Sequence, residues 1–538
     1  MDENNTEWLP HLSNEIVSAA HGNLLDAYAV SLEGWRRGLK LRWHVKDSEK
    51  FSEMRTWFVD RPGQLFSLSS EEKTHYFFRT RGDLVANDAV DIGKDKERTK
   101  AVLKDAGVSV PEGKQFQEHV QDEEIIQYAN KLGYPVVLKP TDGSFGRGVI
   151  SNVTSEGELR YSLEYVRKEL DFPDVIVERY IPGPEYRLYV VGDEVVGAMN
   201  RVPANVVGDG VNSVQALIEM KNEERALNPR LVSCPIEMTQ DVVDYMGRKG
   251  YTLDMVPDKG QQIFLSDKSN ISLGGDPVDV LEELPANIKQ LAVDAIKAVP
   301  GLVHGAVDLI THEEEKKGYI IELNPTAQIG GLLYPIKGTP RDIPAAIIDY
   351  YFPETKGKDR NDTFFDFHDV LDPLQSRDAI STTVTPSPQG KVFAKKYIVS
   401  GNVGDIGYHR GLRKQAFERE LHGFVMSMEN GDIEVVVAGT DPAMVDDFKN
   451  GLFEDEERAQ VIELQEEDYP EPIKVGFEIK ADLKTQIEEL KILRNELEVT
   501  EREMMKAEVQ RRKFYESMSW KATKPIRVAG AIFKKVRS

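Results

Sequence analysis

Helical and strand-like patterns alternate along much of the chain, and this alternation limits its fold more than any other feature. Segments such as ERTKAVLKDAG have apolar residues at helical spacing, whereas YPVVLKP, VIVERYI, EYRLYVVG, EVVGAMNRV, GAVDLI and GYIIELN read as strands. Chains of this kind pack helices against sheets. We therefore expect a large α/β unit over residues 91–353, preceded by a small α/β domain over residues 1–90 in which residues 13–37 form a helix.

The next part of the chain predicts a connection and a second domain. Residues 354–385 contain Asp, Arg and Pro in a pattern typical of a linker. Residues 386–480 then show strands and helices in the order β-α-β-β-α, which predicts a ferredoxin-like α+β domain.

The end of the chain differs from the body in pattern and charge. Leucine or methionine recurs every seven residues at Leu483, Leu490, Leu497 and Met504, so residues 481–515 predict a coiled-coil helix that joins copies into a homo-oligomer. From residue 506 onward ten Lys and Arg stand against two Glu, a local charge of +8. Residues 516–538 therefore predict a basic amphipathic tail that binds an anionic membrane surface, with a solvated or partner-bound helix as the alternative.

Composition excludes several classes of protein. The net charge of −23 over 538 residues argues against nucleic acid as a partner, because phosphate backbones would be repelled. Cys234 is the only cysteine, so no disulfide can form within the chain. The acidic N-terminus is unlike a signal peptide, and no apolar stretch reaches the roughly 20 residues that span a bilayer. We expect a cytoplasmic protein that the tail can bring to the inner face of the membrane.

A glycine-rich loop is the first segment that indicates chemistry. In YPVVLKPTDGSFGRGV a strand ends in Lys139, and Ser144, Gly146 and Gly148 follow. Glycines let backbone N–H groups approach phosphates closely, and a lysine at the strand end can neutralise them. A simple hairpin turn is the alternative interpretation of this segment taken alone.

Acidic residues in later strands support a phosphate site. Glu322 and Asn324 are two apart on one predicted strand and so face the same side, where Asp308 on the preceding strand can meet them. Three oxygen ligands on one face are what Mg²⁺ bridging ATP phosphates requires. Glu178 and Glu185 bracket a Pro-Gly turn, a place from which carboxylates can read an adenine edge and ribose hydroxyls.

The order and spacing of these motifs resemble the ATP-grasp superfamily over roughly residues 90–353. The likeness is greatest to the ATP-grasp modules of cyanophycin synthetase and of bifunctional glutathione synthetase, which share the later signatures SNISLGGD and PIKGTPR. The resemblance implies an ATP-grasp fold and an ATP-dependent carboxylate-amine ligase that uses Mg²⁺ (or Mn²⁺). Such a ligase makes an acyl phosphate, passes it to an amine and releases ADP and phosphate. An amino acid or peptide is the implied substrate.

The resemblance also implies roles for single residues. Lys139 and either Lys96 or Lys100 would contact the nucleotide phosphates, beneath a loop that carries Ser144, Gly146 and Gly148. Glu178 and Ile181 would border the adenine, and Glu185 the ribose. The metal ligands would be Asp308, Glu322 and Asn324. The remaining candidates would lie near the phosphates, the acyl intermediate or the substrates, and they are Arg187, Arg201, Asn270 and Arg341.

The second domain resembles acylphosphatase. The segment VSGNVGDIGYHRGLRKQA matches that family's loop and helix, but His409 and Ser427 stand where the family has its arginine and asparagine. We therefore expect a domain without phosphatase activity. Two other functions stay open, a nucleotide-binding scaffold without turnover and an acylphosphatase-type hydrolase. The string SMSWKATKPIR resembles tails of bacterial cell-surface polysaccharide proteins, which suggests a surface-polymer acceptor.

Overall fold

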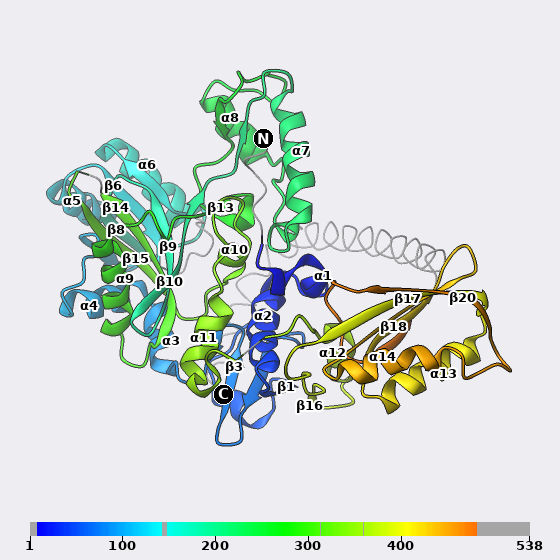
Figure 1. Cartoon of the computed structure of the whole chain (residues 1–538). Coiled ribbons are helices and arrows are strands. Elements are labelled where there is room, and N and C mark those ends of the chain that lie inside the picture. The colour runs from blue at the N-terminus through cyan, green and yellow to red at the C-terminus, as the bar shows by residue number, and fades with distance from the viewer. Residues whose placement is uncertain (1–7, 142–147, 313, 359, 481–538) are drawn as a thin grey trace, which may run out of the picture. The chain divides into compact units, whose positions relative to one another are not determined.

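The computed structural model describes residues 8–141, 148–312, 314–358 and 360–480, and the chain divides into two compact units (Figure 1). The first unit holds Met1–Val392 together with Pro472–Val475. The second unit holds Phe393–Glu471 and, of the described residues after Val475, residues 476–480.

An antiparallel sheet with the strand order β16-β1-β2-β3-β4 opens the first unit. Its strands are β1 (Lys40–His44), β2 (Leu65–Ser69), β3 (Thr74–Phe78), β4 (Arg81–Gly82) and β16 (Ser381–Thr383). Helix α2 (Asn23–Arg36) packs on the sheet and is buried from Leu25 through Arg36. The single helix expected over 13–37 is wrong: a short α1 (Asn14–Val17) precedes α2, and Gly22 between them has a φ of 58°, which interrupts a helix.

The segment expected to be a linker belongs instead to this sheet and its core. Strand β16 pairs with β1 in the register Arg42↔Thr383. Helix α12 (Phe367–Gln375) buries Phe367 and Leu371 in the core that α2 also lines. The linker prediction for 354–385 therefore fails here, because apolar residues at helical spacing give the segment a face that can be buried.

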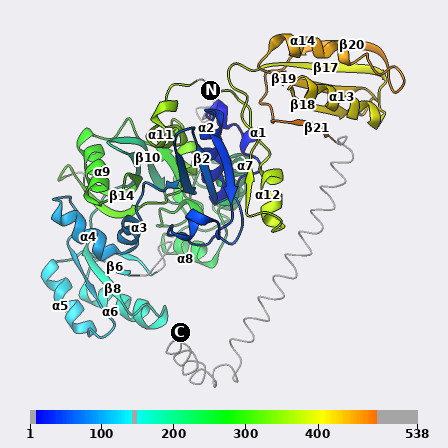
Figure 2. The same ribbon diagram turned by 90° about the horizontal axis from the view of Figure 1, so that it is seen from below.

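Two further antiparallel sheets make up the large α/β part of the first unit. The smaller has the order β5-β8-β6-β7, and α5 (Asp122–Leu132) and α6 (Glu156–Glu164) share its core. Its strands are β5 (Gly113–Phe116), β6 (Val136–Pro140), β7 (Ile150–Val153) and β8 (Val175–Arg179). Figure 2 shows this group in cyan beside the helices α3 (Asn87–Lys94) and α4 (Lys96–Asp105).

The larger sheet has the order β13-β10-β9-β14-β15. Its strands are β9 (Glu185–Val191), β10 (Glu194–Val202), β13 (Asp276–Asp279), β14 (His304–His312) and β15 (Lys317–Asn324). Helix α9 (Ala286–Ala298) packs on its central strands and fills an apolar core with them (Figure 2). The short helix α10 (Gly330–Leu333) and α11 (Ile343–Tyr351) follow the last strand. The strands expected from the apolar runs of the sequence are all present in these two sheets.

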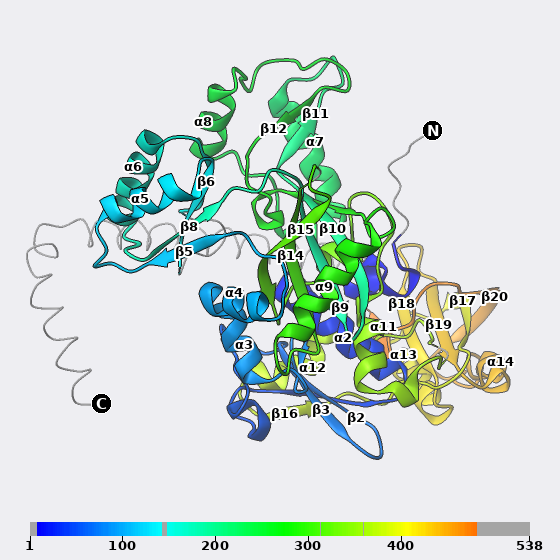
Figure 3. The ribbon, with the colours of Figure 1, turned by 90° about the vertical axis from the view of Figure 1, so that its left-hand side faces the viewer.

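A small lobe is inserted between β10 and β13. It contains β11 (Asn205–Val207), α7 (Val214–Leu227), α8 (Gln240–Arg248) and β12 (Gln262–Phe264), which Figure 3 shows gathered together. Asp276 ties the lobe to the larger sheet, because its carboxylate pairs with Arg225 at 2.8 Å and with Lys221 at 2.5 Å. The SNISLGGD signature thus ends in the carboxylate that anchors the lobe.

The second unit is the expected ferredoxin-like sandwich. Its sheet has the order β20-β17-β19-β18-β21, with α13 (Ile406–Glu418) and α14 (Pro442–Gly451) packed on it. The strands are β17 (Phe393–Asn402), β18 (His422–Ser427), β19 (Ile433–Gly439), β20 (Gln460–Asp468) and β21 (Phe477–Lys480).

The predicted coiled coil over 481–515 and the predicted tail over 516–538 lie outside the described residues. In the part of the chain that the structure describes, no helix combines the length and the apolar character needed to cross a membrane.

Candidate active site

Two carboxylates face each other on neighbouring strands of the larger sheet. Asp308 of β14 lies opposite Glu322 of β15, and a register irregularity follows directly after Asp308. Asn324 is two residues further along β15 and lies opposite Ala306. The predicted meeting of these three side chains at one end of two strands is therefore what the register allows.

Two arginines hold Asp308 in place. Arg187 of β9 is the cross-strand neighbour of Asp308, and its Nε and Nη2 donate to the two carboxylate oxygens at 2.7 and 2.8 Å. Arg201 of β10 donates through Nη2 to Oδ2 of the same carboxylate at 3.0 Å and also pairs with Glu185. Although burial opposes ionisation, Arg187 and Arg201 hold the pKa of Asp308 well below its usual range.

Glu322 has the opposite electrostatic situation. The side chain of Glu322 is exposed to solvent on one side. The protein atoms around it still reduce its solvation, and this is the main cause that raises the pKa of Glu322. Repulsion from Asp308 raises it further. Arg187 and Lys96 act against this rise. A divalent cation placed between the two carboxylates would remove the repulsion.

The donor set fits Mg²⁺ or Mn²⁺. Asp308, Glu322 and Asn324 offer only oxygen atoms, which are the ligands that hard divalent cations take. Asn324 Oδ1 accepts a hydrogen bond from the Thr326 amide at 3.1 Å, which fixes the side-chain amide and leaves a second lone pair on the oxygen.

A second charged cluster lies on the smaller sheet. Oε1 of Glu178 on β8 forms ion pairs with two lysines, with Lys139 of β6 at 2.6 Å and with Lys100 of α4. All three side chains are buried. Burial disfavours the charged form of Glu178, but Lys139 and Lys100 outweigh it and lower the pKa of this carboxyl.

Lys96 lies between the two clusters. Its ammonium donates to the Thr141 carbonyl at 3.2 Å, at the start of the glycine-rich loop. It also acts electrostatically on Lys139 and on Glu322. The sequence left open whether Lys96 or Lys100 is the nucleotide lysine; the structure pairs Lys100 with the buried glutamate and sets Lys96 at the loop.

The remaining nucleotide candidates are placed in part. Ser144 and Gly146 fall among residues that the structure does not describe, whereas Gly148 has a φ of 76°, which suits glycine. Ile181 is buried just after β8. Glu185, expected at the ribose, is paired with Arg201 here.

Two predicted substrate residues, Arg341 and Asn270, make contacts outside these two clusters. Arg341 donates from Nε and Nη2 to the two carboxylate oxygens of Asp279 at 2.8 and 2.7 Å, and from Nη1 to Glu282 at 3.0 Å. The Asn270 carbonyl accepts from the amides of Leu273 and Gly275 at 3.1 and 3.0 Å and so shapes the SNISLGGD loop. Both residues have structural partners in this state.

Sequence reasoning missed contacts between the N-terminal sheet layer and the segment after Asn324. Oδ1 of Asp26 on α2 accepts from the amides of Ile329 and Gly330 at 2.9 and 3.2 Å. The Thr80 hydroxyl donates to the Ala327 carbonyl at 2.9 Å. These pairs are hundreds of positions apart, so no local pattern in the sequence could indicate them.

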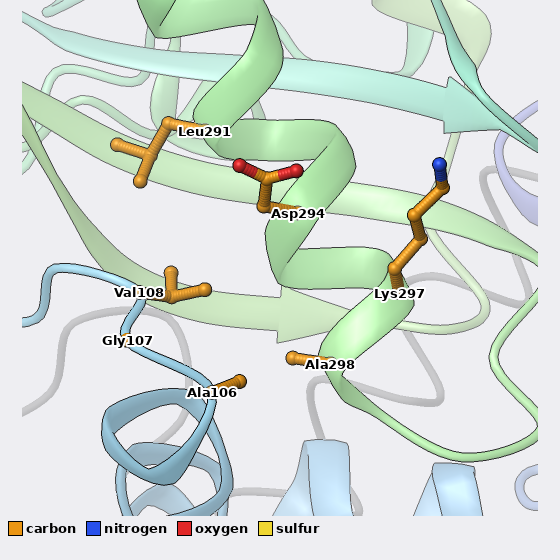
Figure 4. A pocket seen from close by; sticks show the side chains of 7 residues that line it. All are labelled: Ala106, Gly107, Val108, Leu291, Asp294, Lys297 and Ala298. Carbon is orange, nitrogen blue, oxygen red and sulfur yellow. The ribbon is translucent and has the colours of Figure 1, made fainter.

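A surface hollow of about 330 Å³ lies away from all of these residues. Its lining comes from 106–108 and from α9, and Figure 4 shows Asp294 and Lys297 projecting from the helix. Asp294 accepts from Gln290 at 2.8 Å, and Lys297 pairs with Asp193 at 2.7 Å. Both charged side chains of the hollow therefore already have a partner within the chain.

Comparison with known families agrees with this architecture. Residues 93–228 match the RimK-like ATP-grasp domain, and residues 395–479 match acylphosphatase. The chain is 34% identical over 272 residues to cyanophycin synthetase from Synechocystis, a match that covers 49% of this chain and 31% of that one. It is 33% identical over 280 residues to the glutathione biosynthesis bifunctional protein GshAB from Enterococcus faecalis, covering 49% of this chain and 36% of that one.

A crystal structure of a bifunctional glutathione synthetase from Pasteurella multocida aligns over 54% of this chain and 40% of that one, with 30% identity and a TM-score of 0.44. The match to this chain spans about a third of the length of the first curated relatives, for example 31% of the Synechocystis protein. Both matched domains occur here in the order that the sequence predicted. The chain therefore carries a RimK-like ATP-grasp domain, similar to those of cyanophycin synthetases and bifunctional glutathione enzymes, followed by an acylphosphatase-like domain.

Proposed function

We propose that the chain is an ATP-dependent carboxylate-amine ligase, which forms an amide or peptide bond through an acyl phosphate. The observation that carries this proposal is the facing pair Asp308 and Glu322, with Arg187 bound to one of them. A partly buried arginine beside a repelled carboxylate suits a reaction in which negative phosphoryl groups and a cation meet. The likeness to ligases of amino acids and peptides supports the same reaction class.

The proposed reaction has two steps. A carboxylate oxygen of the substrate attacks the γ-phosphorus of ATP, and the bond to ADP breaks with its electron pair on ADP. An amine then attacks the acyl carbon, phosphate leaves with its electron pair, and the nitrogen loses a proton. Asp308, Glu322 and Asn324 would hold Mg²⁺ (or Mn²⁺), which supplies charge neutralisation for the phosphates. The protein needs no nucleophile of its own.

The lysine cluster has a clear part in this scheme. Glu178 holds Lys100 and Lys139 together in a buried site. Phosphate oxygens would compete with this carboxylate for the two lysine side chains, which Glu178 positions before ATP arrives. Arg201 can likewise exchange Glu185 for a phosphate oxygen.

The substrates are proposed from chemistry and likeness together. We propose an amino acid or a peptide as one partner and a bacterial surface polymer as an acceptor. Attachment to an anionic membrane by residues 516–538 and a homo-oligomer through 481–515 remain proposals about segments outside the described residues.

The test is a screen of amino acids and dipeptides for nucleotide products. Purified full-length protein with ATP and Mg²⁺ should release ADP and phosphate when the right acid and amine are both present. Glu322→Gln should abolish this release, because it removes the charge of one proposed metal ligand at a solvent-exposed position. Release of AMP and pyrophosphate would rule the mechanism out. Tight ATP binding with no turnover across the panel would favour the scaffold function.

A further inference from the structure

A group of four buried polar side chains beside the strand of the proposed metal ligands contains three with unused hydrogen-bonding capacity. We call Asp26, Arg79, Arg230 and Thr326 the head-group cluster. All four side chains are buried, and they come from α2, the end of β3, the lobe and the segment after Asn324. Buried polar groups normally have partners, so each unmet one needs an explanation.

Asp26 is the acid of the cluster. Its Oδ1 accepts two amides, but its Oδ2 has no hydrogen-bond partner among the described residues, although Asp26 is only 1% exposed. Burial raises the pKa of Asp26 to about 6, while the Ile329 amide, Arg230 and Arg79 favour the charged form. An ammonium group at Oδ2 would complete the coordination of this carboxylate.

Arg79 is the cation of the cluster, and it attracts the Asp26 carboxylate. Its φ of 57° is unusual for a residue with a side chain, and such strain is kept where the surroundings demand it. Its Nε donates to Gln64 at 2.8 Å and its guanidinium lies over the Phe78 ring, yet within the described residues its two Nη groups have no hydrogen-bond acceptor. Asp26 and Arg79 attract each other without forming an ion pair in that part of the chain.

The other two members are Arg230 and Thr326. Arg230 Nη2 donates to Gln328 at 3.1 Å and its stem packs on Gly330, where an added Cβ would lie 2.5 Å from Cδ. The Thr326 hydroxyl is buried and finds no partner in the described chain. Thr326 follows the proposed metal ligand Asn324 by two residues, so their Cα atoms are within about 7 Å.

From these groups we propose that the head-group cluster binds the zwitterionic head of the amino-acid substrate, with Asp26 taking the α-ammonium and Arg79 the α-carboxylate. An ammonium group held by a carboxylate keeps its proton and is not a nucleophile. With both α-groups held, the bound amino acid reacts through its side chain, and the proposal makes this a distal carboxylate that becomes phosphorylated near Asp308 and Glu322. This inference rests on the proposed ligase function and adds which substrate binds and by which end.

The test uses free L-amino acids, including L-aspartate and L-glutamate, with the full-length protein, ATP and Mg²⁺. Two readouts are measured: ADP release, separated into KM and kcat, and the rise of the thermal midpoint caused by each amino acid. For the amino acid that responds, the N-acetyl derivative and the α-amide are then compared. We expect each blocked form to raise KM of the natural protein at least about tenfold, because one charged hydrogen bond is lost.

Two substitutions separate recognition from folding. Asp26→Asn keeps an oxygen for the Ile329 and Gly330 amides but removes the charge, so it should erase the preference for the free amine. Arg79→Gln should erase the preference for the free α-carboxylate. The matched controls are Asp91→Asn and Arg55→Gln, an ion pair of an exposed arginine and a half-buried aspartate, and either change should leave both readouts as in the natural protein.

The outcomes distinguish this inference from the proposed function. If the natural protein releases ADP but both variants keep its discrimination against blocked amino acids, the cluster is not the head-group site and the ligase function stands. If AMP is formed, the ligase function fails, and the thermal readout still decides whether Asp26 and Arg79 bind an amino acid. A panel in which no amino acid changes either readout would overturn the inference.

Discussion

Arg187 donates two hydrogen bonds to the carboxylate of Asp308 on the neighbouring strand, from Nε to Oδ1 at 2.7 Å and from Nη2 to Oδ2 at 2.8 Å. The two residues are direct cross-strand partners, so the pair is set by the register of β9 and β14. A two-point contact of this kind fixes the plane of the carboxylate as well as its position. It therefore orients a proposed metal ligand before any ligand binds.

The first prediction concerns this fork. Arg187→Lys keeps the positive charge but offers a single point donor, so the carboxylate of Asp308 loses its fixed plane. We expect kcat for ADP release to fall by about 10²–10³-fold, the usual effect of losing a preorganised donor. Steady-state kinetics measure this. The control is Arg160→Lys, which changes an exposed ion pair with Glu156 and should alter the rate little. Equal rates in the two variants would show that the fork has no part in turnover.

The second prediction concerns the turn before β9. Gly183 has a φ of 148°, and an added Cβ would lie 1.9 Å from the Thr311 carbonyl oxygen. Gly183→Ala should therefore push β9 from β14 and lower the free energy of unfolding by about 1–3 kcal/mol. Thermal or denaturant unfolding measures the loss. Gly157→Ala in α6 meets open space and should be neutral or stabilising. A Gly183→Ala protein as stable as the Gly157→Ala protein would contradict the close approach.

The third prediction concerns pH. His304 is buried between the hydroxyls of Tyr189 and Tyr351, each 3.1 Å from a ring nitrogen. Burial, with Arg81 next, lowers the pKa of His304 to about 3. Below pH 6.5, roughly the pKa of an unfolded histidine, His304 is protonated in the unfolded chain but stays neutral in the folded chain. The free energy of unfolding therefore falls as the pH drops toward 3. At pH 5 this amounts to about 2 kcal/mol.

His304→Gln should remove this part of the acid sensitivity, even if it lowers stability at neutral pH. Unfolding midpoints at pH 7 and pH 5 compare the variant with the natural protein and with His21→Gln, a change at an exposed histidine. An equal loss on acidification in all three proteins would show that His304 does not carry the effect.

The fourth prediction concerns the acylphosphatase-like domain. The Asp405 carboxylate accepts the amides of Gly407 and Tyr408 at 2.6 and 3.2 Å, so the chain's own carboxylate occupies donors at the start of α13. The His409 ring contacts the Val403 carbonyl at 3.0 Å, while Arg410 is exposed. We expect no hydrolysis of acetyl phosphate above the rate in buffer. Saturable hydrolysis that survives Glu322→Gln and is lost in His409→Ala would show an active hydrolase.

Periodicity along single strands was enough to place the proposed metal ligands. Side chains two apart on a strand share a face whatever the rest of the fold does, so Glu322 and Asn324 could be assigned to one side, with Asp308 as the nearest partner across a tight connection. The same local rules indicated the helices and strands of the second unit. They also made residues 13–37 appear continuous, because Gly22 interrupts a helix only through its φ.

Only the tertiary structure decided which charges meet. Arg187 and Asp308 are 121 positions apart, and Asp26 lies 303 positions from Ile329, so their pairing depends on strand order and on how α2 packs. The same holds for Lys100, which reaches Glu178 from a helix, and for α12, which the sequence made part of a linker. Local patterns determine which face of an element is apolar or charged. The partner of that face is chosen by burial across the whole chain, which no short segment of sequence contains.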